Sequence, residues 1–479
     1  MKQSPRYNDG TLYVYGLVSS IILGFISYSP YGLFPKLLAI GSSILAFTLL
    51  WDVLLNKNMK SLYILPFITL NWLYFQSPFL LREKTYYYNR IIQEEYIDEI
   101  AIYCCLSIIC MFLGYVYFLN KRTNPLTSSR LRFKKEVIKN VVYFFIFLSV
   151  VFRVGEVISP NLISALSNLI QLLPYSSTIA FGFYVMIVLN RKRTFELSVL
   201  DIIVLIFIGS EFLIRLSTTL FSEVAILFAG PLLVYWREKG KLPIVQIMIA
   251  LLVMIPLYET RKYFRLHSEE VKDFSGGDLS KGRLVLENAY ELKNQKDFNA
   301  LQQQQQSEAF NRFENLSFIS HVVLMHKKGI KPFLNGETFY WLPLVPVPRV
   351  IFPAKPKNVM STDVATEYGL RGEVSIASIN FPMLVEGYIN FGFKGMVLMS
   401  LLFGIAYKWF ASKFGFGVGD LNLIIVMNSV KQFTHAEGNI TLVFGALIQV
   451  YLFWYVVVWF FKLNENNKLF YVEKSTDSI

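Results

Sequence analysis

The chain has 479 residues, of which 54% are hydrophobic and 17% are charged, and its formal net charge is +12. Apolar runs of helix-spanning length recur from residue 11 to residue 462, which excludes a soluble globular protein and predicts an integral membrane protein. The basic residues are distributed over separate loops and form no motif that recognises nucleic-acid bases, so the positive charge does not indicate nucleic acid as a partner.

The apolar runs predict an all-α polytopic protein that spans the lipid bilayer many times. Taking about 20 apolar residues per crossing, we expect about 12 transmembrane helices. A long polar segment divides the chain into a membrane bundle (1–258), a large loop region (259–392) and C-terminal spans with a tail (393–479). The expected spans are 12–28, 33–54, 62–81, 100–119, 137–158, 173–189, 199–215, 218–236, 242–258, 393–411, 421–435 and 440–461.

Basic residues gather in alternate short loops, among them 121–135, 191–193 and 237–241. Because positively charged loops stay in the cytoplasm, we expect both termini to be cytoplasmic and residues 259–392 to be external. The first apolar run follows only two basic residues and lacks a small-residue cleavage site, so we expect an uncleaved helix.

Charged residues also stand at the expected outer ends of spans. Arg153 is three residues from Glu156, and Glu211 is four residues from Arg215, which places each pair on one helix face. Two interpretations remain open for them. They are structural ion pairs that lower the cost of charge near the bilayer, or they are functional groups.

Cysteine and histidine do not indicate a metal site. Cys104, Cys105 and Cys110 lie in one expected span and predict neither a disulfide framework nor a zinc site. The four histidines form no HExxH motif, and no loop is rich in carboxylates, so we expect neither a metal nor another cofactor.

The external segment changes character along its length. Residues 259–282 are charged and broken by glycines, whereas the composition of 283–326 favours helix. The second half of that stretch carries an apolar stripe that we expect to lie on the membrane surface or on the helix bundle. The stripe consists of Phe310, Phe313, Leu316, Ile319 and Val323.

Prolines dominate the segment that follows, within residues 341–371. Each proline fixes φ near −65° and lacks an N–H, so we expect an extended, semi-rigid strand. Arg349, Lys355 and Lys357 stand on it and form a plausible cradle for phosphate, because guanidinium and ammonium groups make charge-assisted hydrogen bonds. The prolines are Pro343, Pro346, Pro348, Pro353 and Pro356.

Further cations join this strand in one expected external vestibule, where we expect them to bind a diphosphate. A solvated surface role remains open for each of them alone. The full set is Arg261, Arg265, Arg312, Arg349, Lys355, Lys357 and Arg371.

Two residues compete for the role of general base. Glu386 lies in an apolar, glycine-bearing setting at the mouth of a span, and such a setting favours proton uptake by a carboxylate. His435 lies in the sequence THAEG, in a short external turn, where a packing role is the alternative.

The order of these elements resembles the Wzy-type oligosaccharide repeat-unit polymerases, which assemble O-antigen and related bacterial polysaccharides. The resemblance rests on many spans, one large late external loop, the helix motif Asn311-Arg312-Phe313, and then LVPVPRVIFPAKP, TEYG and EGYINFGFKG. The specific match covers about residues 310–395.

The resemblance implies a GT-C-like fold and a metal-independent glycosyltransferase in the bacterial cytoplasmic (inner) membrane. It implies transfer of a growing glycan from undecaprenyl diphosphate to a lipid-linked repeat unit, for O-antigen, lipopolysaccharide or capsule. Arg349 and the nearby cations would stabilise the departing diphosphate, and Glu386 or His435 would be the base. The implied partners are the undecaprenyl-diphosphate-linked oligosaccharide, a chain-length regulator and a flippase.

Three other functions remain open. An O-antigen ligase uses the same donor and differs in its acceptor. A lipid-linked oligosaccharide flippase should show two related halves, and no internal repeat is visible in this chain. A receptor or structural membrane protein is the non-enzymatic alternative.

Overall fold

The structure is a computed structural model of the whole chain. The residues that it describes are 8–27, 31–56, 59–81, 86–87, 90–91, 94–117, 126, 131–159, 172–191, 197–217, 221–240, 243, 247, 315–340, 342–345, 347, 352, 363–369, 381–414, 419–434, 438–463 and 468–472. The expected span 242–258 therefore lies outside the described residues, apart from two isolated positions.

Most of the described chain is α-helix, as expected for a polytopic membrane protein. Within this part of the chain, 6 helices are long and apolar enough to cross a membrane. Each contains or overlaps a span expected from the sequence. They are α1 (Asp9–Ile26), α2 (Leu33–Asn56), α5 (Ile97–Tyr117), α6 (Lys135–Ile158), α17 (Met383–Phe414) and α19 (Ile440–Phe460).

The chain forms two compact units, each built from segments that are distant in sequence. Unit 1 comprises residues 1–127, 309–416 and 431–458, and unit 2 comprises residues 128–308, 417–430 and 459–479. Helix α18 (Asp420–Thr434) has residues in both.

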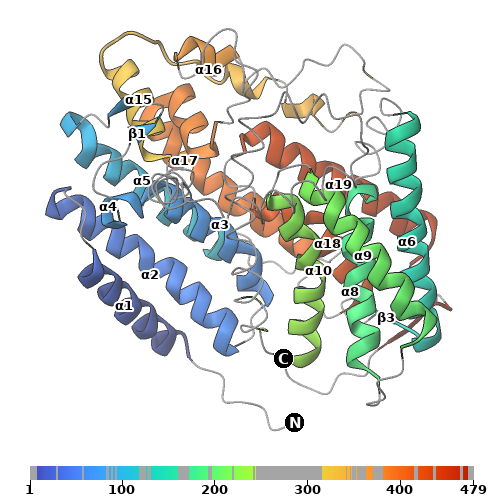
Figure 1. Cartoon of the computed structure of the whole chain (residues 1–479). Coiled ribbons are helices and arrows are strands. Elements are labelled where there is room, and N and C mark those ends of the chain that lie inside the picture. The colour runs from blue at the N-terminus through green and yellow to red at the C-terminus, as the bar shows by residue number, and fades with distance from the viewer. Residues whose placement is uncertain are drawn as a thin grey trace, which may run out of the picture. The chain divides into compact units, whose positions relative to one another are not determined.

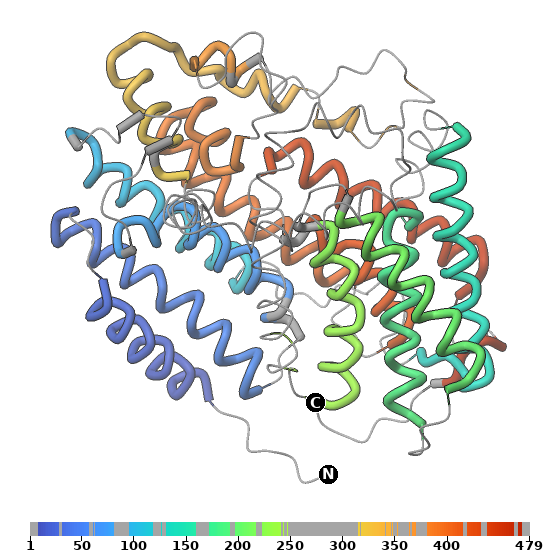
Figure 2. Tube along the Cα trace, in the orientation of Figure 1, coloured from blue at the N-terminus to red at the C-terminus, as the bar shows by residue number. Residues whose placement is uncertain are grey.

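The N-terminal helices of unit 1 pack as neighbours of alternating direction. Helices α1 and α2 lie side by side as an antiparallel pair (Figure 2). The Trp72 indole N–H near the end of α3 (Met59–Phe75) donates to the Ala39 carbonyl near the start of α2 at 3.0 Å. The Gln76 side-chain amide donates to the Ala101 carbonyl of α5 at 3.1 Å. The end of α3 therefore meets the starts of both neighbours.

A continuous helix at 62–81 was a wrong prediction. Helix α3 ends at Phe75, the chain turns at Gln76 and Ser77, and a single turn of helix, α4 (Pro78–Leu81), follows. Proline lacks an N–H and restrains the residue before it, so Pro78 suits the first turn of a new helix better than a helix interior, although α3 itself contains Pro66. Short segments connect α4 to α5. They are β1 (Tyr86–Tyr87), which pairs with β2 (Arg90–Ile91), and the 3₁₀ helix η1 (Glu94–Tyr96).

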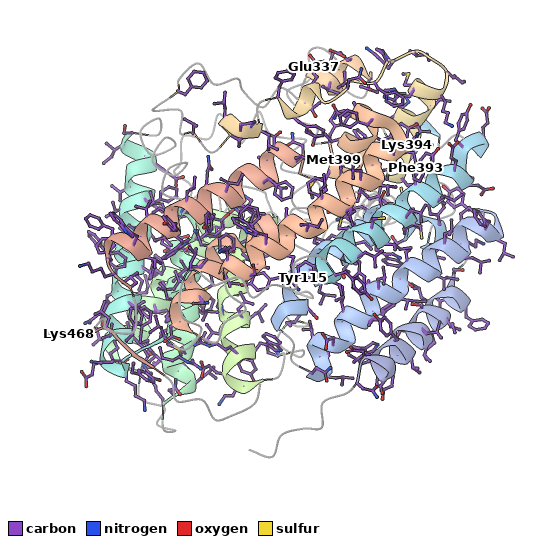
Figure 3. The ribbon with its side chains drawn as sticks, turned by 180° about the vertical axis from the view of Figure 1, so that it is seen from behind. Tyr115, Glu337, Phe393, Lys394, Met399 and Lys468 are labelled. Carbon is purple, nitrogen blue, oxygen red and sulfur yellow. The ribbon has the colours of Figure 1, made fainter. Side chains whose placement is uncertain are left out.

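Helices α5 and α17 run parallel to each other through unit 1 (Figure 1). Near the start of α5, Tyr103 stacks on Phe393 with ring centroids 4.2 Å apart. Near its end, the Lys408 ammonium lies 4.9 Å from the Tyr115 ring. Figure 3 labels Phe393 at the upper part of α17 and Tyr115 towards the lower end of α5. Gly404 lets the two backbones touch, because an added Cβ there would overlap the α5 backbone.

Helix α17 is two helical arms joined by a reversal. Phe391 and Gly392 depart from helical backbone angles, and Gly392 has a positive φ of 65°. A Cβ built on Gly387 would lie 3.0 Å from the Cα of Met396, although residues nine apart in a continuous helix are about 13 Å apart. The arm 383–390 therefore folds back along the arm 392–414, whose course matches the expected span 393–411.

The long polar segment 259–392 contributes α15 (Leu316–Lys327), which packs on α5 and α17. Leu316, Ile319 and Val323 are each 0% exposed, so the predicted stripe is confirmed and lies on the helix bundle. Phe310 and Phe313 lie outside the described residues. The Lys327 ammonium forms an ion pair of 2.7 Å with Glu99 at the start of α5.

The predicted extended strand is wrong at its beginning. Residues Leu342–Leu344 form a 3₁₀ helix, η4, and the Val345 N–H donates to the Leu342 carbonyl at 3.2 Å. The φ that Pro343 imposes suits a 3₁₀ turn as well as an extended strand. The other short external elements are η3 (Glu337–Phe339) and α16 (Asp363–Glu367).

Unit 2 is a second group of packed helices. Helix α8 packs on both α6 and α10, and Gly230 of α10 lies against the backbone of Thr178 in α8. The prediction at 173–189 is refined, since its first turn is the 3₁₀ helix η2. The elements are η2 (Leu173–Tyr175), α8 (Ser176–Leu189), α9 (Val199–Ser217) and α10 (Phe221–Lys239).

Two short strands and a charged cluster close one end of unit 2. Strand β3 (Leu131–Phe133) pairs antiparallel with β4 (Phe470–Val472) near the C-terminus. The Asp420 carboxylate at the start of α18 accepts the Phe133 N–H at 2.7 Å and forms an ion pair of 2.8 Å with Arg237 at the end of α10. Basic loop residues are thus held by acidic neighbours within this unit.

Candidate functional site

Among the described site residues, Glu386 is the one best placed to take part in a reaction, and it lies on the short arm of α17. Every residue of 383–390 is buried, and Glu386 itself is 0% exposed. The reversal at Phe391 and Gly392 lays this arm against the start of the long arm. A carboxyl group is thereby held inside unit 1, as the apolar sequence around Glu386 suggested.

The contacts of Glu386 are unequal at its two oxygens. Oε2 accepts the backbone N–H of Ile440, the first residue of α19, at 2.7 Å. Oε1 is buried and has no hydrogen-bond partner of good geometry among the described residues, although the Thr338 hydroxyl faces the carboxyl group. No cation within the described part of the chain forms an ion pair with Glu386. The partial positive charge of the α19 N-terminus is therefore its main electrostatic partner.

Asn390 connects this arm to the external segment. Its Nδ2 group donates to the Glu386 carbonyl and to the Thr338 hydroxyl, each at 2.8 Å. Its Oδ1 accepts the Gly336 N–H at 3.0 Å. The Asn390 amide thus joins the Glu386 main chain to Gly336 and to the half-buried Thr338 hydroxyl across the reversal.

Rings and backbone bonds hold residues 333–340 on the reversal. The Leu334 N–H donates to the Ile389 carbonyl at 3.1 Å, and the Asn335 N–H donates to the Asn390 carbonyl at 3.1 Å. A Cβ added to Gly392 would lie 3.1 Å from the Phe333 ring, so the ring covers a position where only glycine fits its positive φ. In Figure 3, Glu337 of this segment is labelled beyond the upper end of α17.

This arrangement can do two things chemically. A carboxyl group with one fixed and one unbound oxygen can take a proton from a hydroxyl that reaches the unbound oxygen. It can also act as a cap, because Oε2 satisfies an N–H at the helix terminus that has no partner within the helix. Asn439 caps the same terminus, since its Oδ1 accepts the Leu442 N–H at 2.8 Å.

The other predicted site residues lie outside the described residues. They include the second candidate base, His435, and all the cations expected to bind a diphosphate. Those cations are Arg261, Arg265, Arg312, Arg349, Lys355, Lys357 and Arg371. The vestibule expected from them remains a prediction.

The charged pairs at helix ends form a network in unit 2. Arg153 contacts Glu156 at 2.9 Å and Glu211 at 3.1 Å, and Arg215 contacts Glu211 at 3.4 Å. The Arg215 guanidinium also donates to the Pro174 carbonyl at 3.0 Å and to the Ser177 hydroxyl at 2.8 Å. Both predicted pairs are confirmed as ion pairs, and these shared contacts favour the structural interpretation.

A histidine and tyrosine cluster in unit 1 was not singled out from the sequence. The Tyr368 hydroxyl lies 2.8 Å from Nε2 of His326, whose ring stacks on Phe333 with centroids 4.4 Å apart. Nε2 of His321 lies 2.9 Å from the Tyr368 carbonyl. The spacing of His321 and His326 on one helix, followed by TEYG, was the available signal, but no local pattern pairs them.

Among the described residues, no group of His, Cys, Asp and Glu could hold a metal ion. Comparisons with protein-family models, with curated proteins and with solved structures found no match to this chain.

Proposed function

We propose that the chain is a polysaccharide polymerase that transfers a growing glycan from undecaprenyl diphosphate to a lipid-linked repeat unit at the outer face of the cytoplasmic membrane. One observation carries the proposal beyond the sequence pattern. Glu386 is a buried carboxyl group with one oxygen held by the Ile440 N–H and the other without a partner of good geometry among the described residues. That geometry suits a general base.

The position of Glu386 supports the same function. It lies on a short arm packed against a membrane-spanning helix and joined by Asn390 to the segment that leads into the proline-rich, basic stretch. A base at this place would meet a substrate whose lipid lies in the bilayer and whose sugars lie outside. Arg349, Lys355 and Lys357 are the residues that we propose for its diphosphate.

In the proposed step, a hydroxyl of the acceptor sugar gives its proton to Oε1 of Glu386, and its oxygen bonds to the anomeric carbon of the donor glycan. The bond between that carbon and the lipid diphosphate breaks, and its electron pair leaves with the diphosphate. Cations around the diphosphate would stabilise the charge that develops there. Because Glu386 is 0% exposed, the hydroxyl reaches Oε1 only after a neighbouring segment moves.

Two substitutions of Glu386 separate catalysis from capping. Glu386→Gln keeps an oxygen that can accept the Ile440 N–H but has no basic group. We expect normal abundance in the membrane and a loss of chain extension of about 100-fold or more. Glu386→Ala removes both functions, so it should also reduce abundance. The measurement is the glycan ladder of a deletion strain that carries each variant, together with immunoblots of its membranes.

The matched control is Glu367→Gln, which changes an exposed carboxylate of the same external segment and should leave the ladder unchanged. A wild-type ladder from Glu386→Gln would show that Glu386 only caps α19. Arg349→Ala tests the diphosphate site in the same strain, with the exposed Lys328→Ala as its control.

The products also distinguish the remaining functions. Single repeat units on the final acceptor indicate lost polymerisation, as we expect for Arg349→Ala. Long chains that stay on the carrier lipid would indicate a ligase. Repeat units that never reach the outer leaflet would indicate a flippase.

A further inference from the structure

The hydrogen bonds around Glu386 restrict the direction in which the Thr338 hydroxyl can donate its proton. Asn390 uses both of its amide hydrogens, one towards the Glu386 carbonyl and one towards the Thr338 hydroxyl. A hydroxyl group has a single proton and can accept through its lone pairs. Because Thr338 accepts from Asn390, its own proton is free to point to another acceptor.

The acceptor that faces this proton is the carboxyl group of Glu386, which also receives the Ile440 N–H. Oε1 of that carboxyl group is buried without a partner of good geometry among the described residues, so a half-buried donor and an orphaned buried acceptor lie close together. A small change in the Thr338 or Glu386 side-chain torsions would join them.

We propose that Thr338 and Asn390 are positioning residues for Glu386: Thr338 directs its hydroxyl proton to the carboxyl group, and Asn390 fixes the orientation of that hydroxyl. The effect on glycan transfer rests on the proposed function. The hydrogen-bonded contact itself does not.

This network ties the external segment to the buried carboxyl group. Thr338 belongs to η3, which follows a stretch that is hydrogen-bonded to the reversal at Ile389 and Asn390.

The test compares two substitutions at Thr338. Thr338→Val keeps the shape of the side chain and removes the hydroxyl, whereas Thr338→Ser keeps the hydroxyl and removes a methyl group. In the deletion strain and in extension assays, we expect about a tenfold loss for Thr338→Val, since a hydrogen bond to a charged group is lost. Thr338→Ser should extend chains like the wild type, which a role in packing alone would not predict.

A second readout does not depend on glycan transfer. The infrared band of the Glu386 carboxyl group is identified in purified protein as the band that Glu386→Gln removes. Loss of a hydrogen bond changes the frequency of this band, so we expect it to move in Thr338→Val and in Asn390→Ala and to remain in place in Thr338→Ser.

An unmoved band in Thr338→Val would overturn the proposal whatever the glycan ladder shows. A moved band with undiminished chain extension would also overturn the positioning role. Failure of the proposed function has a different signature, because Glu386→Gln itself would then retain chain extension.

Discussion

At Glu386, a buried carboxyl group is stabilised by a helix terminus, and within the described part of the chain no cation pairs with it. The Ile440 N–H lies 2.7 Å from Oε2, and the aligned peptide dipoles of α19 add a partial positive charge. A lysine or arginine at this place would compete with a substrate for the carboxyl group. The helix terminus stabilises it and leaves Oε1 for another donor.

His326 should make the docking of α15 dependent on pH. Burial lowers the pKa of His326 from its ordinary value, with an opposing contribution from the Lys331 backbone. The neutral ring is therefore favoured in the folded protein, and the stabilisation is present above about pH 6.5, the unfolded value, and is lost as the pH falls below it. We expect hydrogen exchange of the α15 amides, corrected for the intrinsic dependence of exchange on pH, to become severalfold faster from pH 7 to pH 5.

The variant His326→Gln should remove this pH dependence, because glutamine does not titrate. Tyr368, Tyr388, Lys331, Glu99 and Lys327 near the ring have ordinary pKa values outside the range 5 to 7, whereas His321 of the same cluster has one inside it, so His321→Gln is the comparison variant. An equal acceleration in His326→Gln would assign the effect to another group.

Arg215 should be needed for stability rather than for chemistry. Its side chain is 2% exposed and has partners in Glu211, Glu223, Pro174 and Ser177. Glu211 keeps Arg153 as a partner in Arg215→Met, but the Pro174 carbonyl and the Ser177 hydroxyl lose a buried donor, so we expect unit 2 to be destabilised by about 1 to 3 kcal/mol.

Thermal unfolding of the purified variant and its abundance in membranes measure this effect, with the exposed Lys239→Met as the control. Normal folding and abundance of Arg215→Met together with lost chain extension would instead make Arg215 a functional cation. That result would reverse the structural interpretation of the network.

Among the elements, the reversal in α17 depends on glycine. A Cβ on Gly395 would lie 2.7 Å from the Gly387 carbonyl oxygen, so the two arms could not keep their separation. We expect Gly395→Ala to destabilise the protein by about 1 to 3 kcal/mol, as overpacking does. The measurement is the unfolding transition of the detergent-solubilised protein.

Gly41→Ala is a matched control in α2 of the same unit, because an added Cβ there meets nothing within 4 Å. Alanine is the better helix former, so this control should be neutral or slightly stabilising. Equal effects of the two substitutions would show that the close approach of the arms does not limit stability.

The elements that the sequence predicts well are those with a strong periodic or hydropathic signal. The long apolar runs and the stripe of Leu316, Ile319 and Val323 were found, because burial of apolar surface follows directly from their spacing. The reversal at Phe391 was not predicted, because FGFKG is compatible with a continuous helix. Only the contact of Gly387 with Gly395 and Met396 requires a turn. Pro343 was placed in a strand because its φ suits two conformations.

For the whole molecule, composition predicted a helical membrane protein, and the described helices, of which 6 are long and apolar enough to cross a membrane, are consistent with one. The candidate site could be predicted less well. Burial of Glu386 followed from its apolar neighbours, whereas Thr338 and Ile440, which face its carboxyl group, come from two other segments that no local pattern connects. Tertiary packing decides such contacts, and the sequence signal for them is weak.

The central claim is that this protein joins lipid-linked repeat units. The most direct measurement places the purified chain in vesicles with repeat units on undecaprenyl diphosphate, extracted from the deletion strain, and follows product length and released carrier lipid. We predict chains of two and more repeats, with one undecaprenyl diphosphate released per bond formed, and none with Glu386→Gln. Repeat units that stay single with folded wild-type protein would contradict the account.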